Sequence, residues 1–508
     1  MNDCRPPSSP RPRRARWLGV FALGSVVALA AFAAPPPAPQ TLIAISGDGS
    51  LTLRWEAVPG ATSYTVGRRT SATSGNYTTV ATGLTATTHT DTGRTNGTPY
   101  FYVVTAAGPD GTSGPSNQAR GTPVAALPAG TDVRWPLADS PAADADVIRY
   151  AFGPRNIGRY DFHAGLDLNA AQGTPVHAVM AGTVTNRTEW DGVTTGSGNN
   201  LLVSHGSGRW TAYLHLHGFA AGIGIGSAVS AGQVIGYVGK TGATSNHLHF
   251  TYFVGLTSES SNEMRSRSPL ELLPRTPGVG AEAVFSTNGS RTVDILIPAQ
   301  QNTIRWIILR GAGVTRLVDY YDIVGQGSTL RDNPKQSGLV IQVAAPTIPY
   351  PGGGGTVQLV VAPDPDAPWG DFDPTRITVL DFHGNILVDR TAYESWKFTH
   401  GLTLDAADDS DADADGLPLL VEYALDLDPH MATWVGAPQL VHTDADRVEF
   451  TYRRKRPELT YTVEASADLV NWSAAGVTQE FAVTGDQVTA ATTLDAAGRK
   501  FLRLAVTR

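Results

Sequence analysis

Short stretches in which apolar and polar residues alternate recur along most of this 508-residue chain. Residues 51–55 alternate in this way, and residues 100–104 are aromatic and β-branched; both patterns are typical of strands. Glycine, proline and asparagine turns separate such stretches, and residues 131–275 show no helical period. The pattern predicts a mainly β protein, and the length predicts a multidomain chain of about three or four domains.

Changes in this pattern divide the chain into successive units. Proline-rich residues 34–40 predict a stiff linker after the N-terminal segment. The predicted units are a β-sandwich at 41–123, a second β domain at 131–275, a β-rich domain of unknown role at 276–400, an acidic loop with a short helix at 401–430, and a C-terminal β domain at 431–508.

The first 33 residues have the pattern of a targeting segment. Five arginines and one aspartate precede an apolar run at 17–33, which ends in Ala31-Phe32-Ala33. This pattern predicts a secretory signal peptide at 1–33 and an exported protein, either periplasmic or extracellular and associated with the cell wall. A membrane anchor is the weaker alternative, because the run is shorter than the ~20 apolar residues of a spanning helix. Cys4, the single cysteine, lies in this segment, so the mature chain has no disulfide.

Composition narrows the classes of partner. The formal net charge is −8, and only 17% of residues are charged. No segment resembles a basic domain, which argues against nucleic acid as a partner. Once the signal peptide is cleaved, no remaining segment is apolar enough to predict a membrane span.

Residues 41–123 resemble a fibronectin type III module. The marks are Trp55 within LTLRWEAVPGATSYTV and Tyr100 within GTPYFYVVTAAGPDGTSGPSN. The resemblance implies a β-sandwich, but this fold carries no single function. A spacer and a glycan- or wall-binding module both remain open.

Histidines concentrate in one part of the chain. Seven of the twelve lie between residues 163 and 249, and three clusters have short spacings: His163-x-x-x-Asp167, His215-x-His217 and His247-x-His249. Even spacing places both members of each cluster on one face of a strand. Two histidines and one carboxylate meet the requirement of a catalytic zinc site, which keeps a position for water. For any single histidine, the alternative to metal binding is a structural role as a packed side chain.

Three sequence motifs around these histidines resemble the lysostaphin-type zinc endopeptidases of bacterial cell walls. They are YAFGPRNIGRYDFHAGLDLNAAQGTPVHAVMAGTV, NNLLVSHGSGRWTAYLHLHGF and VSAGQVIGYVGKTGATSNHLHFTYF, in the order that the family has them. The resemblance implies that His163, Asp167 and His249 bind zinc and that His215 and His247 are catalytic. It also implies a small antiparallel β domain with a groove that is open at both ends.

The same resemblance implies a function. We expect a zinc-dependent endopeptidase that hydrolyses peptide bonds of peptidoglycan, in the stem or the cross-bridge, by a metal-activated water. The sequence TSNHLHFT departs from the family pattern on both sides of the last motif, which leaves the substrate preference open. Two other functions remain open: an inactive peptidase-fold regulator, and a cell-wall-binding or adhesion protein.

The remaining histidines of this region are assigned other roles. We expect His217 to be exposed or to support the site from outside, His205 to be structural, and His177 to flank the groove.

The acidic segment carries a second candidate metal site. Its carboxylates and turn glycine match the twelve-residue calcium loop Asp-x-Asp-x-Asp-Gly-x5-Glu: Asp411, Asp413, Asp415, Gly416 and Glu422. Pro418 departs from paired EF-hands and is expected in the first turn of a short helix at 419–425. The loop is similar to the solitary calcium loops of dockerins and thrombospondin type 3 repeats. A structural calcium ion is therefore predicted, with an Asp-rich solvated linker as the alternative.

Overall fold

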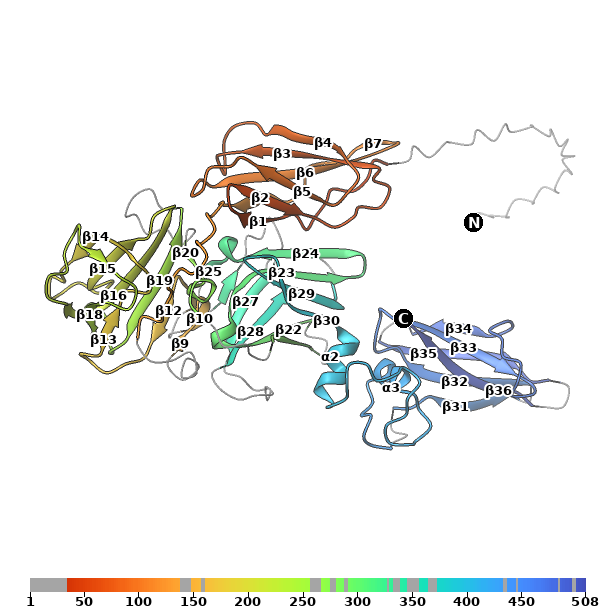
Figure 1. The fold of residues 1–508 in the computed structure, drawn as a ribbon. Coiled ribbons are helices and arrows are strands. Elements are labelled where there is room, and N and C mark those ends of the chain that lie inside the picture. Colours follow the sequence, from red (N-terminus) through yellow and green to blue (C-terminus); the bar gives the residue numbers. More distant parts are fainter. Residues whose placement is uncertain are drawn as a thin grey trace, which may run out of the picture.

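The computed structural model describes most of the chain after the N-terminal segment (Figure 1). The described residues are 34–137, 148–156, 160–255, 266–274, 280–286, 291–326, 329–331, 339–344, 356–363, 372–432, 436–444, 446–482, 485–495 and 499–508. The predicted signal peptide at 1–33 lies outside them. Every strand pairing among the described residues is antiparallel, and the prediction of a mainly β, multidomain protein is confirmed.

The N-terminal sandwich consists of two sheets that pack face to face. One sheet has the order β1-β2-β5, and the other has the order β4-β3-β6-β7 with β8 paired to β6. Their bounds are β1 Ile43–Gly47, β2 Ser50–Arg54, β3 Ser63–Arg69, β4 Thr78–Leu84, β5 Thr88–Thr92, β6 Tyr100–Gly108, β7 Gly111–Thr112 and β8 Ala119–Gly121. Leu51 and Leu53 are fully buried and Trp55 packs edge to face on Tyr64, as the alternating pattern requires.

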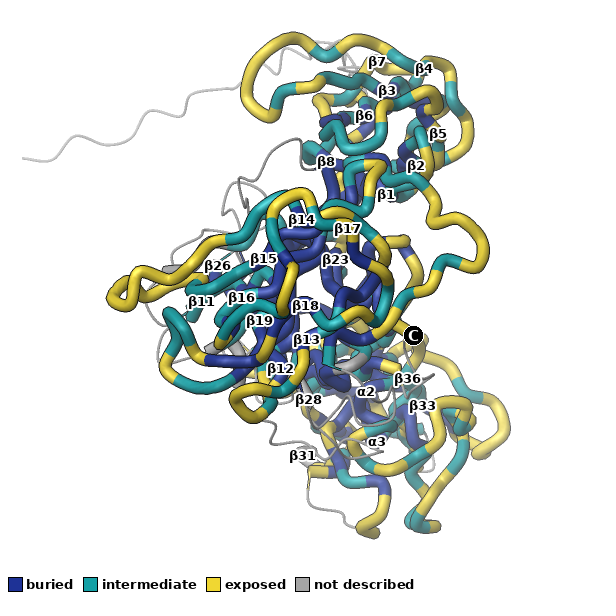
Figure 2. The backbone as a smooth tube through the Cα atoms, turned by 60° about the vertical axis from the view of Figure 1, so that its left-hand side comes forward, coloured by how far each residue is buried: buried dark blue, intermediate teal, exposed yellow. Residues whose placement is uncertain are grey.

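The second unit, here called the histidine-bearing sheet, is the ten-stranded sheet that follows. Its main path is β17-β14-β15-β16-β19-β12-β9, with β13, β18 and β20 attached at its sides, and a separate hairpin, β10-β11, lies beside it. The bounds are β9 Ile148–Tyr150, β10 Gly153–Asn156, β11 Tyr160–His163, β12 Leu166–Leu168, β13 Pro175–His177, β14 Gly182–Thr188, β15 Asn199–Ser204, β16 Arg209–Phe219, β17 Ala228–Val229, β18 Val234–Val238, β19 Leu248–Val254 and β20 Ser266–Arg267. Figure 2 shows buried backbone along its strands and exposed backbone in its loops.

The middle sandwich contains a six-stranded and a four-stranded sheet. Their orders are β21-β22-β28-β27-β26-β25 and β24-β23-β29-β30. The bounds are β21 Glu282–Phe285, β22 Val293–Pro298, β23 Ile304–Gly311, β24 Val314–Asp319, β25 Val324–Gln326, β26 Thr329–Arg331, β27 Leu339–Ala344, β28 Thr356–Pro363, β29 Arg376–Asp381 and β30 Ile386–Thr391. Short 3₁₀ turns are η3 Pro269–Glu271, η4 Ala299–Gln301 and η5 Tyr320–Asp322.

The C-terminal unit combines a helix with two small sheets. The sheets are β31-β32-β35-β34 and β33-β36, with bounds β31 Gln439–Asp444, β32 Arg447–Arg453, β33 Thr460–Ser466, β34 Thr478–Phe481, β35 Gln487–Thr493 and β36 Phe501–Thr507. Helix α3, Leu419–Leu425, packs on them and has the bounds expected from the sequence. Pro418 is the N-cap residue of α3, in extended backbone, and not a first-turn residue as expected.

Helix α2, Ala392–Thr399, joins the middle sandwich to the C-terminal unit and was not expected from the sequence. The sequence does contain a helix-start signal, Thr391 followed three residues later by Glu394. The Thr391 hydroxyl accepts a hydrogen bond from the Glu394 amide, and the Glu394 carboxylate accepts one from the Thr391 amide. This reciprocal arrangement is a capping box. The N-terminal sandwich and the C-terminal unit lie on opposite sides of the middle sandwich (Figures 1 and 2).

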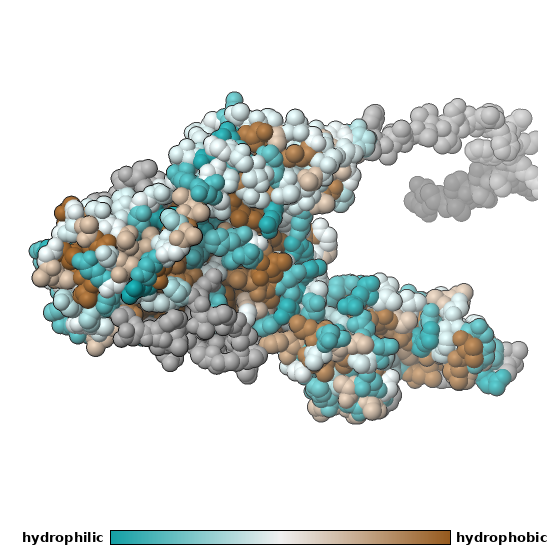
Figure 3. Space-filling model, in the orientation of Figure 1, coloured by the Kyte–Doolittle hydropathy of each residue, from teal (hydrophilic) through white to brown (hydrophobic). Residues whose placement is uncertain are grey.

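The N-terminal sandwich packs directly on the middle sandwich. Ile43 and Ile45 of β1 form one buried cluster with Trp306 and Ile308 of β23. Ile307 and Leu309, which alternate with these two residues along β23, lie in the core of the middle sandwich, so this strand is buried on both faces. Its continuous apolar sequence follows from that double burial. Figure 3 shows apolar residues at this junction between two more hydrophilic surfaces. Among the described residues, no helix is long and apolar enough to cross a membrane.

Candidate metal centre

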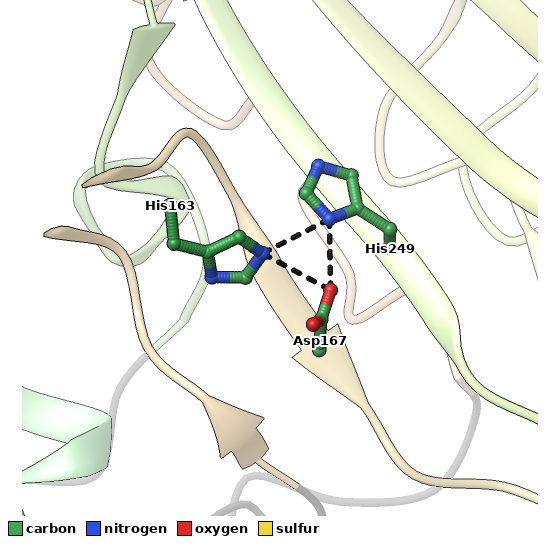
Figure 4. A group of neighbouring side chains, drawn as sticks. All are labelled: His163, Asp167 and His249. Carbon is green, nitrogen blue, oxygen red and sulfur yellow. Dashed lines mark hydrogen bonds and ion pairs between the residues drawn. The ribbon is translucent and has the colours of Figure 1, made fainter. Parts of the chain in front are cut away.

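Three strands bring two histidines and one aspartate to a single point. His163 is the last residue of β11, Asp167 is the middle residue of β12, and His249 is the second residue of β19. Asp167 and His249 stand opposite each other in the β12–β19 pairing. Figure 4 shows the three side chains pointing toward one another. The structure therefore brings together the three residues predicted to bind zinc.

Strand alternation explains why two of these polar side chains share a face. The residues that flank Asp167 and His249 in their strands are apolar and at most 1% exposed: Leu166, Leu168, Leu248 and Phe250. Successive residues of a strand point to opposite faces, so burial of these four directs Asp167 and His249 to the other face of the sheet. The core thus orients the polar residues.

The three side chains approach within hydrogen-bond distance. Nε2 of His163 lies 3.0 Å from Oδ1 of Asp167 and 3.0 Å from Nδ1 of His249. Nδ1 of His249 lies 2.8 Å from the same Oδ1. These three atoms, here called the ligand triangle, are largely enclosed, because His163 is 1% exposed and Asp167 4% exposed.

The hydrogen bonds around the ligand triangle fit a metal cation. Nδ1 of His163 lies 2.8 Å from the carbonyl oxygen of Ala151, which can only accept, so Nδ1 carries the proton. In a ring protonated only at Nδ1, Nε2 presents a lone pair to Oδ1 of Asp167, which is also an acceptor. A cation between these atoms removes the conflict, and two imidazoles with one carboxylate suit a catalytic zinc ion with an open position.

Electrostatics keep two of the three groups in the form that binds metals. Burial opposes the charged form of Asp167, but His163 and His249 outweigh it and hold the pKa of this carboxyl well below its usual range. Burial lowers the pKa of His249 to about 4. At neutral pH Asp167 is therefore ionised and His249 is neutral, as metal coordination requires.

Two further imidazoles stand beside the ligand triangle. The ring of His215, on β16, lies 4.7 Å from the ring of His247 and 6.1 Å from that of His249, measured between centroids. Nδ1 of His215 donates to the Thr241 carbonyl at 3.0 Å, and Nδ1 of His247 donates to the Ser245 carbonyl at 2.9 Å. In the neutral ring this leaves each Nε2 as a free base, and that of His247 lies 3.7 Å from Oδ1 of Asp167.

The backbone of His215 adopts an uncommon conformation. Its φ is +62°, inside a strand, and its amide donates to the Ser197 carbonyl at 3.0 Å. A left-handed residue other than glycine costs on the order of 1–3 kcal/mol, and such residues cluster at functional sites. The conformation directs this ring toward His247. Burial lowers the pKa of His215, which favours the neutral base.

Sequence reasoning missed Arg155, which holds the aspartate of the triangle. Nη1 of Arg155 donates to Oδ2 of Asp167 at 2.9 Å, and Nε donates to Oδ1 of Asp161 at 2.8 Å. Arg155 and Asp161 are cross-strand partners in the β10–β11 hairpin, a pairing of opposite charges that could have drawn attention to it. Because Arg155 occupies Oδ2, Oδ1 is the oxygen that faces the two histidines.

The hairpin that carries His163 is anchored in the core of the middle sandwich. Phe152 and Phe162 contact edge to face with centroids 5.3 Å apart, and each also contacts an aromatic ring of the middle sandwich, Phe382 and Tyr320 respectively. The Asn302 side chain donates to the Phe152 carbonyl at 3.2 Å. One residue of the ligand triangle is thus positioned by residues far along the chain.

The other histidines lie apart from the triangle. His205 bonds the Ala181 carbonyl through Nδ1 and the Thr211 hydroxyl through Nε2, both at 2.8 Å, which agrees with the expected structural role. His217 is exposed and meets Gln172 at 3.3 Å. His177 lies on β13, and its buried Nδ1 has no hydrogen-bond partner in the described part of the chain.

The structure also gathers the acidic residues of the predicted calcium loop. Carboxylate oxygens of Asp411, Asp413 and Asp415 all lie within 4.8 Å of one another. Glu422, the fourth predicted ligand, is in helix α3 and is 1% exposed. This second cluster belongs to the C-terminal unit and not to the histidine-bearing sheet.

The comparisons define the class of this domain. The model of Peptidase family M23 matches residues 161–260, which include the ligand triangle and both neighbouring histidines. Residues 161–260 therefore form an M23 peptidase domain, and the resemblance to lysostaphin-type peptidases expected from the sequence is confirmed.

Individual relatives match over part of their length. The chain is 42% identical to DD-carboxypeptidase/endopeptidase Mpg of Neisseria meningitidis over 89 residues, 17% of this chain and 19% of the relative. It is 35% identical to lysostaphin of Staphylococcus simulans over 115 residues, 22% of each chain. The chain thus spans about a fifth of the length of these two curated relatives.

A third relative concerns the N-terminal sandwich. A solved Fn3-like protein from Clostridium thermocellum is 41% identical and matches 17% of this chain and 90% of its own, with a TM-score of 0.16. The match spans nearly all of that protein's own chain.

Proposed function

We propose that the protein is an exported zinc endopeptidase that hydrolyses peptide bonds in the stem or the cross-bridge of peptidoglycan. The observation that carries the proposal is the ligand triangle inside an M23 peptidase domain, flanked by two imidazoles with free Nε2 atoms. One relative, DD-carboxypeptidase/endopeptidase Mpg, supports a peptidase activity by its name. Export, and action in the periplasm or at the cell wall, rest on the signal peptide predicted at 1–33.

The residues divide the chemistry between them. Zinc held by His163, Asp167 and His249 would lower the pKa of a bound water to about 7 and polarise the substrate carbonyl. His215 and His247 would orient this water through Nε2 and accept its proton. Either ring, once protonated, would stabilise the developing oxyanion or return the proton to the leaving amine.

Hydrogen bonds from outside the site hold the side chains in the orientations that these roles require. Backbone carbonyls hold the Nδ1 side of His163, His215 and His247, so all three rings present Nε2 to the site. Arg155 holds the outer oxygen of Asp167. Such outer contacts fix ligand orientation, and their loss typically lowers metal affinity or activity about 10–100-fold.

Zinc-dependent hydrolysis tests the proposal. Purified full-length protein, incubated with peptidoglycan sacculi, is expected to release free amines at a rate that falls to background after chelation and returns with added zinc. The amines are measured by derivatisation, and bound zinc is measured by atomic mass spectrometry in the same samples. Stoichiometric zinc without amine release from any wall substrate would instead support the inactive regulator or the wall-binding protein.

The anchored hairpin gives a prediction that separates metal binding from folding. Phe152→Ala removes a ring that is 1% exposed and holds the hairpin to the middle sandwich. We expect zinc affinity to fall about 10–100-fold, because His163 loses its support. Affinity is measured by competition with a chromophoric chelator.

A buried phenylalanine elsewhere provides the matched control for this variant. Phe450→Ala opens a cavity in the C-terminal unit and, like Phe152→Ala, is expected to cost about 3–5 kcal/mol of stability. Zinc affinity should remain at the wild-type value in the control. Equal zinc affinity in both variants would show that the middle sandwich does not position His163.

A further inference from the structure

The acidic loop before α3 arranges its carboxylates around a common space. Asp411 accepts backbone hydrogen bonds from Ala414 at 2.7 Å and from Gly416 at 2.8 Å. Asp413 and Asp415 accept similar bonds through one oxygen each, from the amides two residues later. These bonds curl the chain, and Gly416, with φ +92°, takes a conformation that suits glycine.

A buried carboxylate without a partner lies in the first turn of the helix that follows this cluster. Glu422 is 1% exposed, and its Oε2 has no hydrogen-bond partner; the same holds for Oδ2 of Asp413. The amide of Leu419 donates to the Ser410 carbonyl at 2.8 Å and that of Leu420 to the Asp408 carbonyl at 3.1 Å, so the loop folds back against the first turn of α3, which carries Glu422. A buried carboxylate left without a partner is costly, so this arrangement calls for a cation.

Protein cations do not fill this role in the part of the chain that the structure describes. Lys397 and Arg508 pair with Asp408, and Arg456 pairs with Asp426. Within the described residues no lysine or arginine forms an ion pair with any of the four carboxylates. Among the described residues, no side-chain cation therefore compensates the negative charge of these four carboxylates.

We propose that Asp411, Asp413, Asp415 and Glu422 bind one calcium ion. The donors are all hard carboxylate oxygens, with no nitrogen or sulfur, which disfavours zinc. Several carboxylates in one loop suit the six to eight oxygens that calcium takes, whereas magnesium keeps most of its waters and uses about one or two carboxylates. This site is independent of the proposed peptidase activity, since Figure 1 places α3 away from β19.

The ion would connect the loop to the C-terminal unit. Glu422 lies next to Tyr423, whose ring packs 4.8 Å from Tyr393 of α2 and whose hydroxyl donates to Glu458 at 2.6 Å. The Tyr461 hydroxyl donates to the carbonyl of Ala424 at 2.9 Å. A cation bound at Glu422 would thus stabilise the junction between α2, α3 and the C-terminal sheets.

Calcium titration of the full-length, zinc-loaded protein tests the proposal. After removal of calcium by a chelating resin and restoration of zinc, calorimetric titration is expected to give one calcium ion per chain. Thermal unfolding should show the transition of the C-terminal unit rise by several degrees in 1 mM calcium chloride, and equal magnesium should give a smaller shift. No heat of binding and no shift, or an equal shift with magnesium, would overturn the assignment.

Two substitutions that remove one charge each sharpen the test. Glu422→Gln keeps the shape of the buried side chain and should weaken calcium binding at least tenfold. Asp409→Asn changes an exposed aspartate of the same segment outside the four and should leave binding unchanged. An equal loss of calcium affinity in both variants would mean that binding depends only on the total charge of the segment, and would overturn the assignment of these four ligands. Amine release should stay at the wild-type rate in both, so this result is separate from the test of the peptidase.

Discussion

Replacement of Asp167 by asparagine, or of His249 by alanine, is expected to remove bound zinc and lower kcat/KM for amine release by ~10³-fold or more. Each residue supplies one atom of the ligand triangle, at 2.8 Å from the other. A catalytic metal contributes several kcal/mol to transition-state stabilisation, and each 1.36 kcal/mol corresponds to a tenfold change in rate. Initial rates and atomic mass spectrometry on the same protein samples measure both quantities.

An exposed aspartate serves as the control for this first prediction. Asp191→Asn makes the same chemical change in a loop residue of the same domain, where the carboxylate bonds only its own turn. This variant should keep zinc and full activity. A His249→Ala protein that retained stoichiometric zinc and wild-type rates would contradict the ligand assignment, because no other described histidine completes the triangle.

Alanine at His215 or His247 is expected to give the opposite pattern, with zinc retained and kcat lowered about 10²–10⁴-fold. Neither ring is part of the ligand triangle, but both keep Nε2 free beside it. Loss of either one removes a group that accepts or returns a proton while the metal ligands stay in place. Zinc content together with kcat and KM distinguishes this pattern from ligand loss.

The neighbouring His217 provides the comparison for these two variants. It lies two residues from His215 but is exposed, so His217→Ala should change kcat less than about twofold. If His215→Ala and His247→Ala both kept the wild-type kcat, proton transfer by these rings would be excluded. Loss of zinc in either variant would make that residue a ligand.

Local sequence patterns predicted a metal site among the clustered histidines, and the resemblance to a known family assigned the ligands and the catalytic residues. Alternation in strands gave the mainly β fold, and the even spacing in His163-x-x-x-Asp167 and His247-x-His249 marked polar positions on strand faces. In the structure, buried Leu166 and Leu248 flank these polar positions and hold them on the opposite face of the sheet. The roles of the site residues remain predictions, which the substitutions above test.

Features that depend on contacts distant in sequence could not be predicted in this way. The anchoring of Phe152 against Phe382 joins residues that no local spacing relates. The continuous apolar run of β23 became understandable only when the N-terminal sandwich was seen to cover its second face. Helix α2 was different, because its capping box at Thr391 and Glu394 was visible in the sequence and was overlooked.

Mass spectrometry of digested peptidoglycan tests the central claim most directly. Zinc-loaded wild-type protein is expected to produce fragments with a new amino terminus and a new carboxyl terminus at one peptide bond, and these termini identify the bond. The Asp167→Asn protein should leave the same bond intact. Intact peptides after digestion by the zinc-loaded wild-type protein, or identical fragments from Asp167→Asn, would contradict the account.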